Sequence, residues 1–362
     1  MTGGTRGWLR KRRGSVLAAL LLVTFAKPGL PHPVSAGELS SPFEFSPHYL
    51  PGDRFMGIRL LGAVALRHMI IDGQLVAELS GLAWDRDEQI LYAVSDGGRL
   101  FHLKPAFEEG ILSGVAGVAG FALRDENGRR LRGVWADSEG LALENADNGI
   151  RGDSVLVVAF ERRPRLARYT PRGRFLGELP LPDGLSSVAN YASANKSLES
   201  VAHHPEFGWL TAPERPMAGD EPGSLHIWNG PGDFWRYPLR AVPNNSLVAM
   251  EVLPGGSLLT LERGHGLFYL PVVISLRRFR LPAPNSPAPL EVSTAAVFDS
   301  SRGWRVDNFE GLTRLDGLRF LLVSDDNENA MQRTLLLQIE LVDPEPRDYS
   351  VPEYDALQKN TH

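Results

Sequence analysis

The sequence has 362 residues, of which 43% are hydrophobic and 22% are charged, a composition that excludes a disordered or fibrous chain. Cysteine is absent, which excludes disulfides, thiolate metal sites, cysteine nucleophiles and a lipidated N-terminal cysteine. Beyond residue 36 the chain carries 32 basic and 43 acidic side chains. This acidic excess argues against nucleic-acid binding, which draws its affinity from clustered lysine and arginine.

The first 36 residues have the pattern of a signal peptide. A basic run at 10–13 precedes an apolar stretch at 16–26, which is too short to span a bilayer, and small residues at 34–36 follow several prolines. We expect cleavage after Ala36, although an uncleaved anchor is the alternative. Arg12 and Arg13 leave the twin-arginine and the general export routes open. The prediction is a periplasmic or secreted protein with no membrane segment after cleavage.

One hairpin-like pattern recurs five times in the rest of the chain. Its first strand opens with a motif such as Ser-Glu-Gly-Leu, and its second strand generally closes on an acidic residue. The copies recur at intervals of 49 to 62 residues, which are too long for helical repeats of about 33–47 residues and suit propeller blades with extended loops. The five copies are 79–96, 138–161, 198–214, 247–262 and 309–325.

Further strand candidates bring each hairpin to roughly the four strands that a propeller blade requires. The final hairpin has one following strand, 334–341, whereas the candidate strand 58–66 precedes the first hairpin without a partner. The prediction is an all-β β-propeller whose ring is closed by the N-terminal strand. It has five or six blades, because the proline-rich residues 265–300 leave a degenerate sixth blade open.

The expected domain organisation has four parts. Residues 1–36 form the signal peptide and residues 37–54 an N-terminal extension. A single propeller domain occupies residues 55–342, and residues 343–362, which are polar and without apolar periodicity, form a C-terminal tail.

Acidic residues mark the ends of these hairpins. In an antiparallel hairpin, the first residue of one strand and the last residue of the next emerge at the same edge of the sheet. A propeller arranges equivalent positions of its blades around one axis. We therefore expect eight carboxylates at one mouth of the central channel, although Ser80 and Val248 hold the opening position in two hairpins. The eight are Asp96, Glu139, Glu161, Glu199, Glu214, Glu262, Glu310 and Asp325.

Crowded carboxylates need neutralising partners, because like charges repel at close range. Oxygen ligands without cysteine favour Ca²⁺ over Zn²⁺, so all eight acids are candidate metal ligands. Arg162, Arg215 and Arg263 directly follow three closing acids, but the alternation of side chains in a strand predicts that they point away from those carboxylates. The alternative interpretation is structural, with the acids hydrogen-bonded to neighbouring blade backbones.

Candidate catalytic residues lie at the same mouth. His265 follows the fourth hairpin and is the candidate for proton transfer, with Glu139 and Glu310 beside it. The sequence has no Gly-x-Ser-x-Gly elbow, no P-loop and no Gly-x-Gly-x-x-Gly motif. It therefore does not fit a serine α/β-hydrolase or a nucleotide-driven enzyme.

At these hairpins the sequence resembles the phytase-like family of exported bacterial proteins, which is described as having esterase-like activity. The similar segments are 79–83 with 92–96, 137–141, 198–202 with 213–214, 259–263, and 307–312 with 322–327; the resemblance runs from about 57 to 341. The family is taken to be a β-propeller distantly similar to calcium-dependent, six-bladed propeller phytases. The resemblance implies a metal-lined mouth built by Glu139, Glu199, Glu214, Glu262, Glu310 and Asp325. It does not imply phytate as substrate, because the lysine- and arginine-rich phosphate clamp of a phytase is not recognisable.

The resulting hypothesis is a monomeric, exported, Ca²⁺-dependent hydrolase of small phosphate or carboxylic esters. Two alternatives stay open. One is a non-enzymatic propeller that binds a ligand or partner, with the acids in structural roles, and the other is a propeller lactonase. Propellers host enzymes and scaffolds alike, so the fold does not decide between them.

Overall fold

The computed structural model describes residues 1, 40–265, 271–329 and 331–342, and the fold below concerns these residues. The predicted signal peptide, apart from Met1, and the predicted C-terminal tail lie outside the described residues. No helix in the described part of the chain is long and apolar enough to cross a membrane. The helices described there are four short 3₁₀ turns, η1 (Gly133–Trp135), η2 (Asp183–Leu185), η3 (Val188–Asn190) and η4 (Ser300–Arg302).

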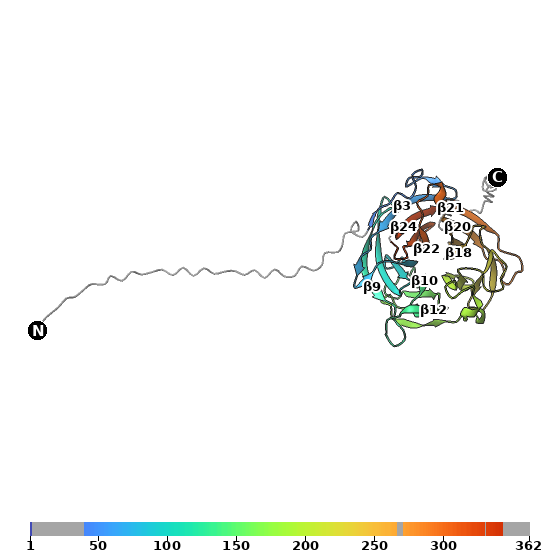
Figure 1. Ribbon diagram of the computed structural model, residues 1–362, viewed down its shortest axis with the longest axis horizontal. Coiled ribbons are helices and arrows are strands. Elements are labelled where there is room, and N and C mark those ends of the chain that lie inside the picture. The colour runs from blue at the N-terminus through green and yellow to red at the C-terminus, as the bar shows by residue number, and fades with distance from the viewer. Residues whose placement is uncertain (2–39, 266–270, 330, 343–362) are drawn as a thin grey trace. The chain divides into compact units, whose positions relative to one another are not determined.

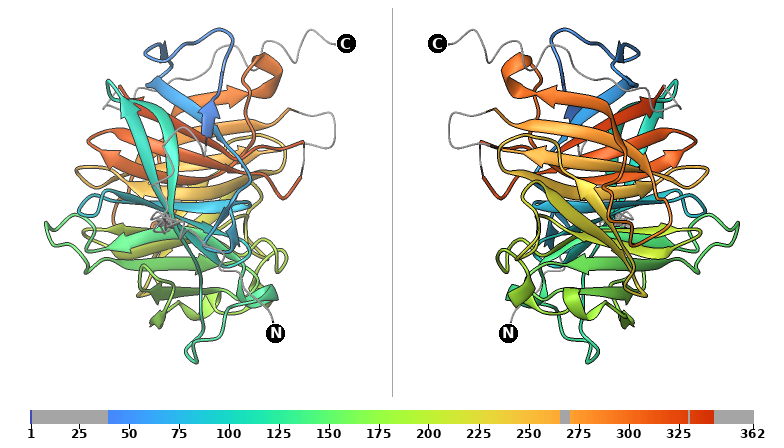
Figure 2. Two further views of the ribbon diagram at one scale, coloured as in Figure 1. Left: turned by 90° about the vertical axis from the view of Figure 1, so that its left-hand side faces the viewer. Right: turned by 90° about the vertical axis from the view of Figure 1, so that its right-hand side faces the viewer.

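Most strands form antiparallel blades arranged in a ring (Figure 1). The side views show the strands running from one face of the ring to the other (Figure 2). Each of the first four blades contains four strands that are consecutive in the chain. They are β6 (Leu79–Asp85), β7 (Ile90–Ser95), β8 (Arg99–Glu108) and β9 (Ile111–Ala122); β10 (Ser138–Glu144), β11 (Val155–Phe160), β12 (Arg165–Tyr169) and β13 (Phe175–Leu179); β14 (Leu198–His204), β15 (Gly208–Pro213), β16 (Ser224–Asn229) and β17 (Phe234–Pro238); and β18 (Asn245–Val252), β19 (Ser257–Gly264), β20 (Val273–Arg280) and β21 (Val292–Asp299).

The fifth blade joins the two ends of the propeller. It contains β22 (Asn308–Asp316), β23 (Arg319–Asp325) and β24 (Leu335–Leu341), and β3 (Ile58–Leu66) pairs with β24. The predicted closure by the N-terminal strand is therefore confirmed. The predicted N-terminal extension also contributes, because β1 (Ser40–Pro42) pairs with β3, as does β2 (Arg54–Phe55). A short hairpin, β4 (Ile70–Ile71) with β5 (Gln74–Leu75), leads into the first blade.

The ring has five blades, and the possibility of a sixth is wrong. Residues 265–300 supply β20 and β21, which are the outer strands of the fourth blade. The prolines that obscured this pattern, at 282, 284, 287 and 289, lie in the loop between the two strands. The innermost strands contact one another in a closed circle, β6 to β10, β14, β18, β22 and back to β6, which leaves no place for another blade.

Buried apolar side chains fill the spaces between neighbouring blades. Tyr92 of the first blade shares one buried cluster with Leu156 of the second, and Trp235 of the third shares another with Leu258 of the fourth. The hydrophobic core is therefore divided among the blade interfaces.

Each inner strand is irregular at one equivalent position. The register with the second strand of the blade shifts there, which is the sign of a β-bulge. A bulge leaves a residue out of the ladder and re-aims its side chain. The residues in these bulges are Ser80, Glu139, Glu199, Val248 and Glu310.

Glycine follows three of the bulges and allows neighbouring inner strands to touch. A Cβ on Gly140 would lie 2.7 Å from the carbonyl oxygen of Glu199 in the next blade, and a Cβ on Gly81 would overlap the carbonyl oxygen of Glu139. The close approach of these backbones therefore requires glycine.

Substituting Gly81 with alanine should destabilise the ring. The added methyl group collides with the backbone of the next blade, so we expect Gly81→Ala to lower the free energy of unfolding by about 1–3 kcal/mol in urea titrations. Gly184→Ala is the matched control, because no atom lies within 4 Å of its added Cβ, and its effect should stay within about 0.5 kcal/mol. Equal stability of the two variants would contradict this account of blade packing.

Candidate functional site

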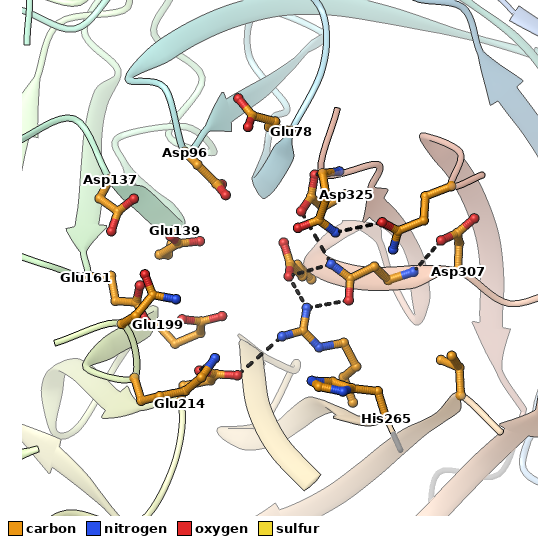
Figure 3. Close-up of a pocket in the computed structure, with 18 of the residues that line it drawn as sticks. Glu78, Asp96, Asp137, Glu139, Glu161, Glu199, Glu214, His265, Asp307 and Asp325 are labelled. Carbon is orange, nitrogen blue, oxygen red and sulfur yellow. Dashed lines mark hydrogen bonds and ion pairs between the residues drawn. The ribbon is translucent and has the colours of Figure 1, made fainter. Parts of the chain in front are cut away.

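The beginnings of the inner strands surround a cavity of about 740 Å³ (Figure 3). Ten carboxylates line it, against three permanently charged cations, Arg162, Lys196 and Arg263. The cavity is therefore strongly acidic. Its carboxylates are Glu78, Asp96, Asp137, Glu139, Glu161, Glu199, Glu214, Asp307, Glu310 and Asp325.

The structure brings seven of the eight predicted carboxylates to this cavity, together with His265. Glu139, Glu199 and Glu310 come from the bulges of the inner strands. The closing acids come from the ends of the second strands, as Asp96 follows β7 and Glu161 follows β11. Figure 3 shows residues of both kinds facing the same space.

The fourth hairpin departs from this pattern by one residue. In the first blade, Leu79 just before the bulge pairs with Ser95, and the closing acid Asp96 is the next residue. In the fourth blade, the equivalent Leu247 pairs with Glu262 itself. Arg263 therefore holds the closing position and lines the cavity, and Glu262 does not. A shift of one residue along a strand turns a side chain to the other face.

Glu262 is fully buried and bonded within the protein. Its carboxylate accepts hydrogen bonds from the Tyr237 hydroxyl at 2.6 Å and from Asn245 Nδ2 at 2.6 Å, and it pairs with Arg277 Nη1 at 2.7 Å. These partners come from the third and fourth blades. We therefore remove Glu262 from the candidate ligands, because its oxygens hold two blades together.

Arg263 does not pair with Glu262, the acid that it follows, as expected, but it neutralises one side of the cavity through two other carboxylates. Its Nη2 lies 3.3 Å from Glu214 Oε1, and its Nη1 contacts Glu310 Oε1. Lys196 Nζ lies 2.6 Å from Glu214 Oε2. Although burial opposes ionisation, Arg263 and Lys196 hold the pKa of Glu214 below its usual value. Glu214 is therefore a paired carboxylate.

The opposite side of the cavity has no such compensation. Within the described residues, no side chain forms an ion pair or hydrogen bond with Glu139 or Glu199, and Asp96 Oδ1 is buried without a hydrogen-bond partner. Burial, together with neighbouring carboxylates, raises the pKa of all three well above the usual range. Burial and nearby acids also raise the pKa of Glu161 and of Asp325 to about 8.

Together with the neighbouring paired acids, these carboxylates have the right chemistry for a divalent cation. Three groups each offer carboxylate oxygens within 4.8 Å of one another, and Glu139 and Glu161 each belong to two of the groups. An all-oxygen set of this kind suits Ca²⁺. The orphaned oxygen of Asp96 supports the fit. The groups are Asp96, Glu139 and Glu310; Asp137, Glu139 and Glu161; and Glu161, Glu199 and Glu214.

Sequence reasoning missed the acids that stand just before the inner strands. Glu78 and Asp137 lie two residues before the bulges of their strands and line the cavity. Asp137 pairs with Arg162, whose Nε lies 3.1 Å from its Oδ2. Burial raises the pKa of both acids. Aligning the hairpins two positions farther upstream would have found them.

His265 also lines the cavity, beside the cationic side. Burial lowers the pKa of its imidazole, and Arg263 and Arg215 lower it further. The ring is therefore neutral near pH 7 and is able to accept a proton.

An adjoining hollow of about 450 Å³ shares Glu78, Asp96, Asp137 and Arg162 with the cavity. It adds the guanidinium groups of Arg130 and Arg132. The acidic cavity therefore has an arginine-rich rim on the side of the second blade.

A family model described as phytase-like, esterase-like activity of phytase, matches residues 74–328. The chain belongs to this phytase-like family. The matched part spans the five inner strands and all the carboxylates of the cavity. Among solved structures, the β-propeller domain of Cps50 (Swd1) from Myceliophteria thermophila is similar, with 12% identity, 85% of this chain and 98% of that chain covered, and a TM-score of 0.34. No curated protein matches the sequence significantly.

The stability of the phytase-like protein without divalent cations should fall as the pH rises. Glu161 and Asp325 have pKa values of about 8 in the folded state, against 4.5 and 3.8 ordinarily, so the folded state retains protons that the unfolded state has lost. The stabilisation is complete below pH 4 and is lost as the pH rises through 8. Calorimetric scans after chelation should show a falling Tm between pH 5 and 9. The double variant Glu161→Gln with Asp325→Asn should flatten that slope, and an unchanged slope would contradict the assignment.

Removing the charge of Arg263 should lower the stability of the folded protein. Arg263→Met leaves Glu214 and Glu310 buried with one partner fewer, so we expect a loss of about 3–5 kcal/mol in the free energy of unfolding at pH 8. The loss should shrink at pH 5, where these carboxylates take up protons more readily. Arg319→Met, which removes an exposed pair with Asp316, should change stability by less than about 1 kcal/mol. A loss that does not depend on pH would argue against neutralisation as the role of Arg263.

Proposed function

We propose that this phytase-like propeller is an exported, Ca²⁺-dependent hydrolase of small phosphate or carboxylic esters that acts in the acidic cavity. The observation that carries the proposal is the convergence of carboxylates, above all Asp96, Glu139 and Glu199, that form no ion pair with a described cation. Keeping such groups ionised is costly without a counter-charge.

The cavity supports a resident cation on one side and a substrate on the other. Glu139, Glu161 and Glu199 would hold the ion, because Glu161 shares one group of close carboxylate oxygens with Glu139 and another with Glu199. A bound divalent cation supplies a Lewis acid that polarises an ester and eases the ionisation of water. A volume of about 740 Å³ is in the range of small-molecule sites.

The chain's own groups supply proton transfer and orientation. The neutral imidazole of His265 would accept a proton from the attacking water. Asp325, with a pKa of about 8, retains a proton near neutrality and would donate it to the leaving group. Arg130, Arg132 and Arg162 at the rim would orient the negative end of an anionic ester.

A non-enzymatic binding propeller is the second candidate. Glu262 shows that an acid at the end of such a hairpin is able to serve packing alone, because Tyr237, Asn245 and Arg277 occupy its oxygens. In that reading, the remaining acids would bind a cationic ligand or partner and not a catalytic metal.

Thermal unfolding separates a metal site from an acidic surface. In the chelated protein, a Ca²⁺ titration should raise the Tm saturably, by the equivalent of about 2.7 kcal/mol at a hundred times the Kd, with Mg²⁺ less effective. Glu139→Gln removes a carboxylate shared by two ligand groups and should weaken the response at least tenfold. Glu221→Gln, an exposed acid that does not line the cavity, should respond as the unaltered protein does. A flat response would overturn the metal site.

Turnover separates the hydrolase from the scaffold. The Ca²⁺-loaded protein should hydrolyse p-nitrophenyl phosphate or p-nitrophenyl acetate, and chelation should abolish the reaction. His265→Gln should lower kcat while the Ca²⁺-dependent Tm shift is retained, because this residue moves a proton in the proposed reaction and does not hold the ion. A Ca²⁺ response with no turnover on any ester tested would favour the binding propeller.

A further inference from the structure

Another cavity of about 450 Å³, separate from the arginine-lined hollow beside the acidic cavity, lies where the inner strands end. We call it the second cavity. It is on the side of the ring away from the acidic cavity. All five inner strands contribute to it. Glu310 faces the acidic cavity and Arg314 lines the second one, and the two are four residues apart on β22, a distance of about 13 Å along a strand. The two cavities therefore occupy opposite ends of the ring's centre.

Arg314 is one of two arginines that line this cavity, and among the described residues its guanidinium has no partner. Among the described residues, its side chain has no hydrogen bond or ion pair, and its Nε is buried without a partner. A buried, unpaired donor of a charged group carries a desolvation penalty that a bound acceptor removes.

The acid Glu251 acts on Arg314 through its charge but forms no ion pair with the guanidinium. Glu251 accepts backbone hydrogen bonds at both carboxylate oxygens, from Val252 N–H at 3.0 Å and from Arg314 N–H at 3.0 Å. Burial raises the pKa of Glu251 in spite of these bonds. Both oxygens accept a backbone hydrogen bond, and the Arg314 side chain forms no hydrogen bond with either of them.

A second arginine and a second acid, Arg86 and Asp147, line the same cavity. Arg86 donates from Nε to the Leu315 carbonyl at 2.7 Å, while its Nη1 contacts Asp147. Burial and the proximity of Arg86 lower the pKa of Arg314. An anion placed beside Arg314 would relieve both unfavourable effects.

The rest of the lining favours an apolar body attached to that anion. Trp84, Leu143 and Met250 present apolar surface, and His203 adds a polar group. A cavity of about 450 Å³ accommodates a small molecule, and a guanidinium fork matches the paired oxygens of a carboxylate or a phosphate.

We propose that this cavity is a second ligand site, in which Arg314 binds the carboxylate or phosphate group of a small organic anion. The site does not depend on the hydrolase proposal, because it shares no lining residue with the acidic cavity. Trp84 lies in the lining and makes its occupation visible by fluorescence.

Calorimetric titration of the full chain with benzoate and with phenyl phosphate, in the presence of chelator, tests the site. We expect either probe to bind at millimolar concentrations and to change the tryptophan fluorescence, and we expect Trp84→Phe to remove that change. The probe that binds identifies the anion. Arg314→Met should raise the Kd at least tenfold, whereas Arg305→Met, a charge loss at an exposed pair with Glu44, should leave it unchanged. Failure of both probes to bind, or binding that Arg314→Met does not weaken, would overturn the proposal.

Chemical modification provides a second test that needs no variant. Phenylglyoxal reacts with accessible guanidinium groups, and peptide mapping reports which arginines are modified. Saturating benzoate or phenyl phosphate should protect Arg314 and leave Arg305 reactive. Protection of neither, or equal protection of both, would contradict the site even if Arg314→Met does not fold.

Discussion

Backbone contact between neighbouring inner strands is the constraint on which the rest of this propeller depends. Gly81 and Gly140 allow one strand to lie against the carbonyl oxygens of the next, and a bulge directly precedes each glycine. The close approach holds the ring together, and the bulge turns a side chain toward the centre. Ring closure and the convergence of carboxylates are therefore two results of one local arrangement, repeated with variations in five blades.

The variation in the fourth blade decides the electrostatics of the cavity. An arginine stands where the other blades have an acid, so one side is neutralised through Glu214 and Glu310 while the other side remains crowded with buried carboxylates. Buried ionised groups without partners are costly, and here the cost is concentrated around Glu139 and Glu199. The asymmetry separates a region suited to a cation from the region in which Arg263 and the neutral imidazole of His265 lie.

The sequence was sufficient for the architecture because the hairpin repeats, and repetition shows equivalent positions without knowledge of contacts. It was insufficient for the number of blades, since the prolines between β20 and β21 concealed two ordinary strands. The same logic found seven acids of the cavity and misplaced Glu262, because the sequence does not show the one-residue offset of the β18 and β19 register. The pKa values depend on burial and on pairs such as Arg263 with Glu310, which only packing establishes.

The pairing of β3 with β24 also has a consequence for biosynthesis. β3 is among the first strands of the propeller to be made, and its partner is the last, so the longest-range contact of the fold joins residues such as Val64 and Leu336. During translation the four complete blades are able to assemble in order, but β3 must wait for the end of the chain before its ladder is filled. Contacts so distant in sequence slow folding, and the unpaired edge is open to other chains meanwhile. The pairing of β24 with β3 is therefore the step that closes this strand edge of the ring.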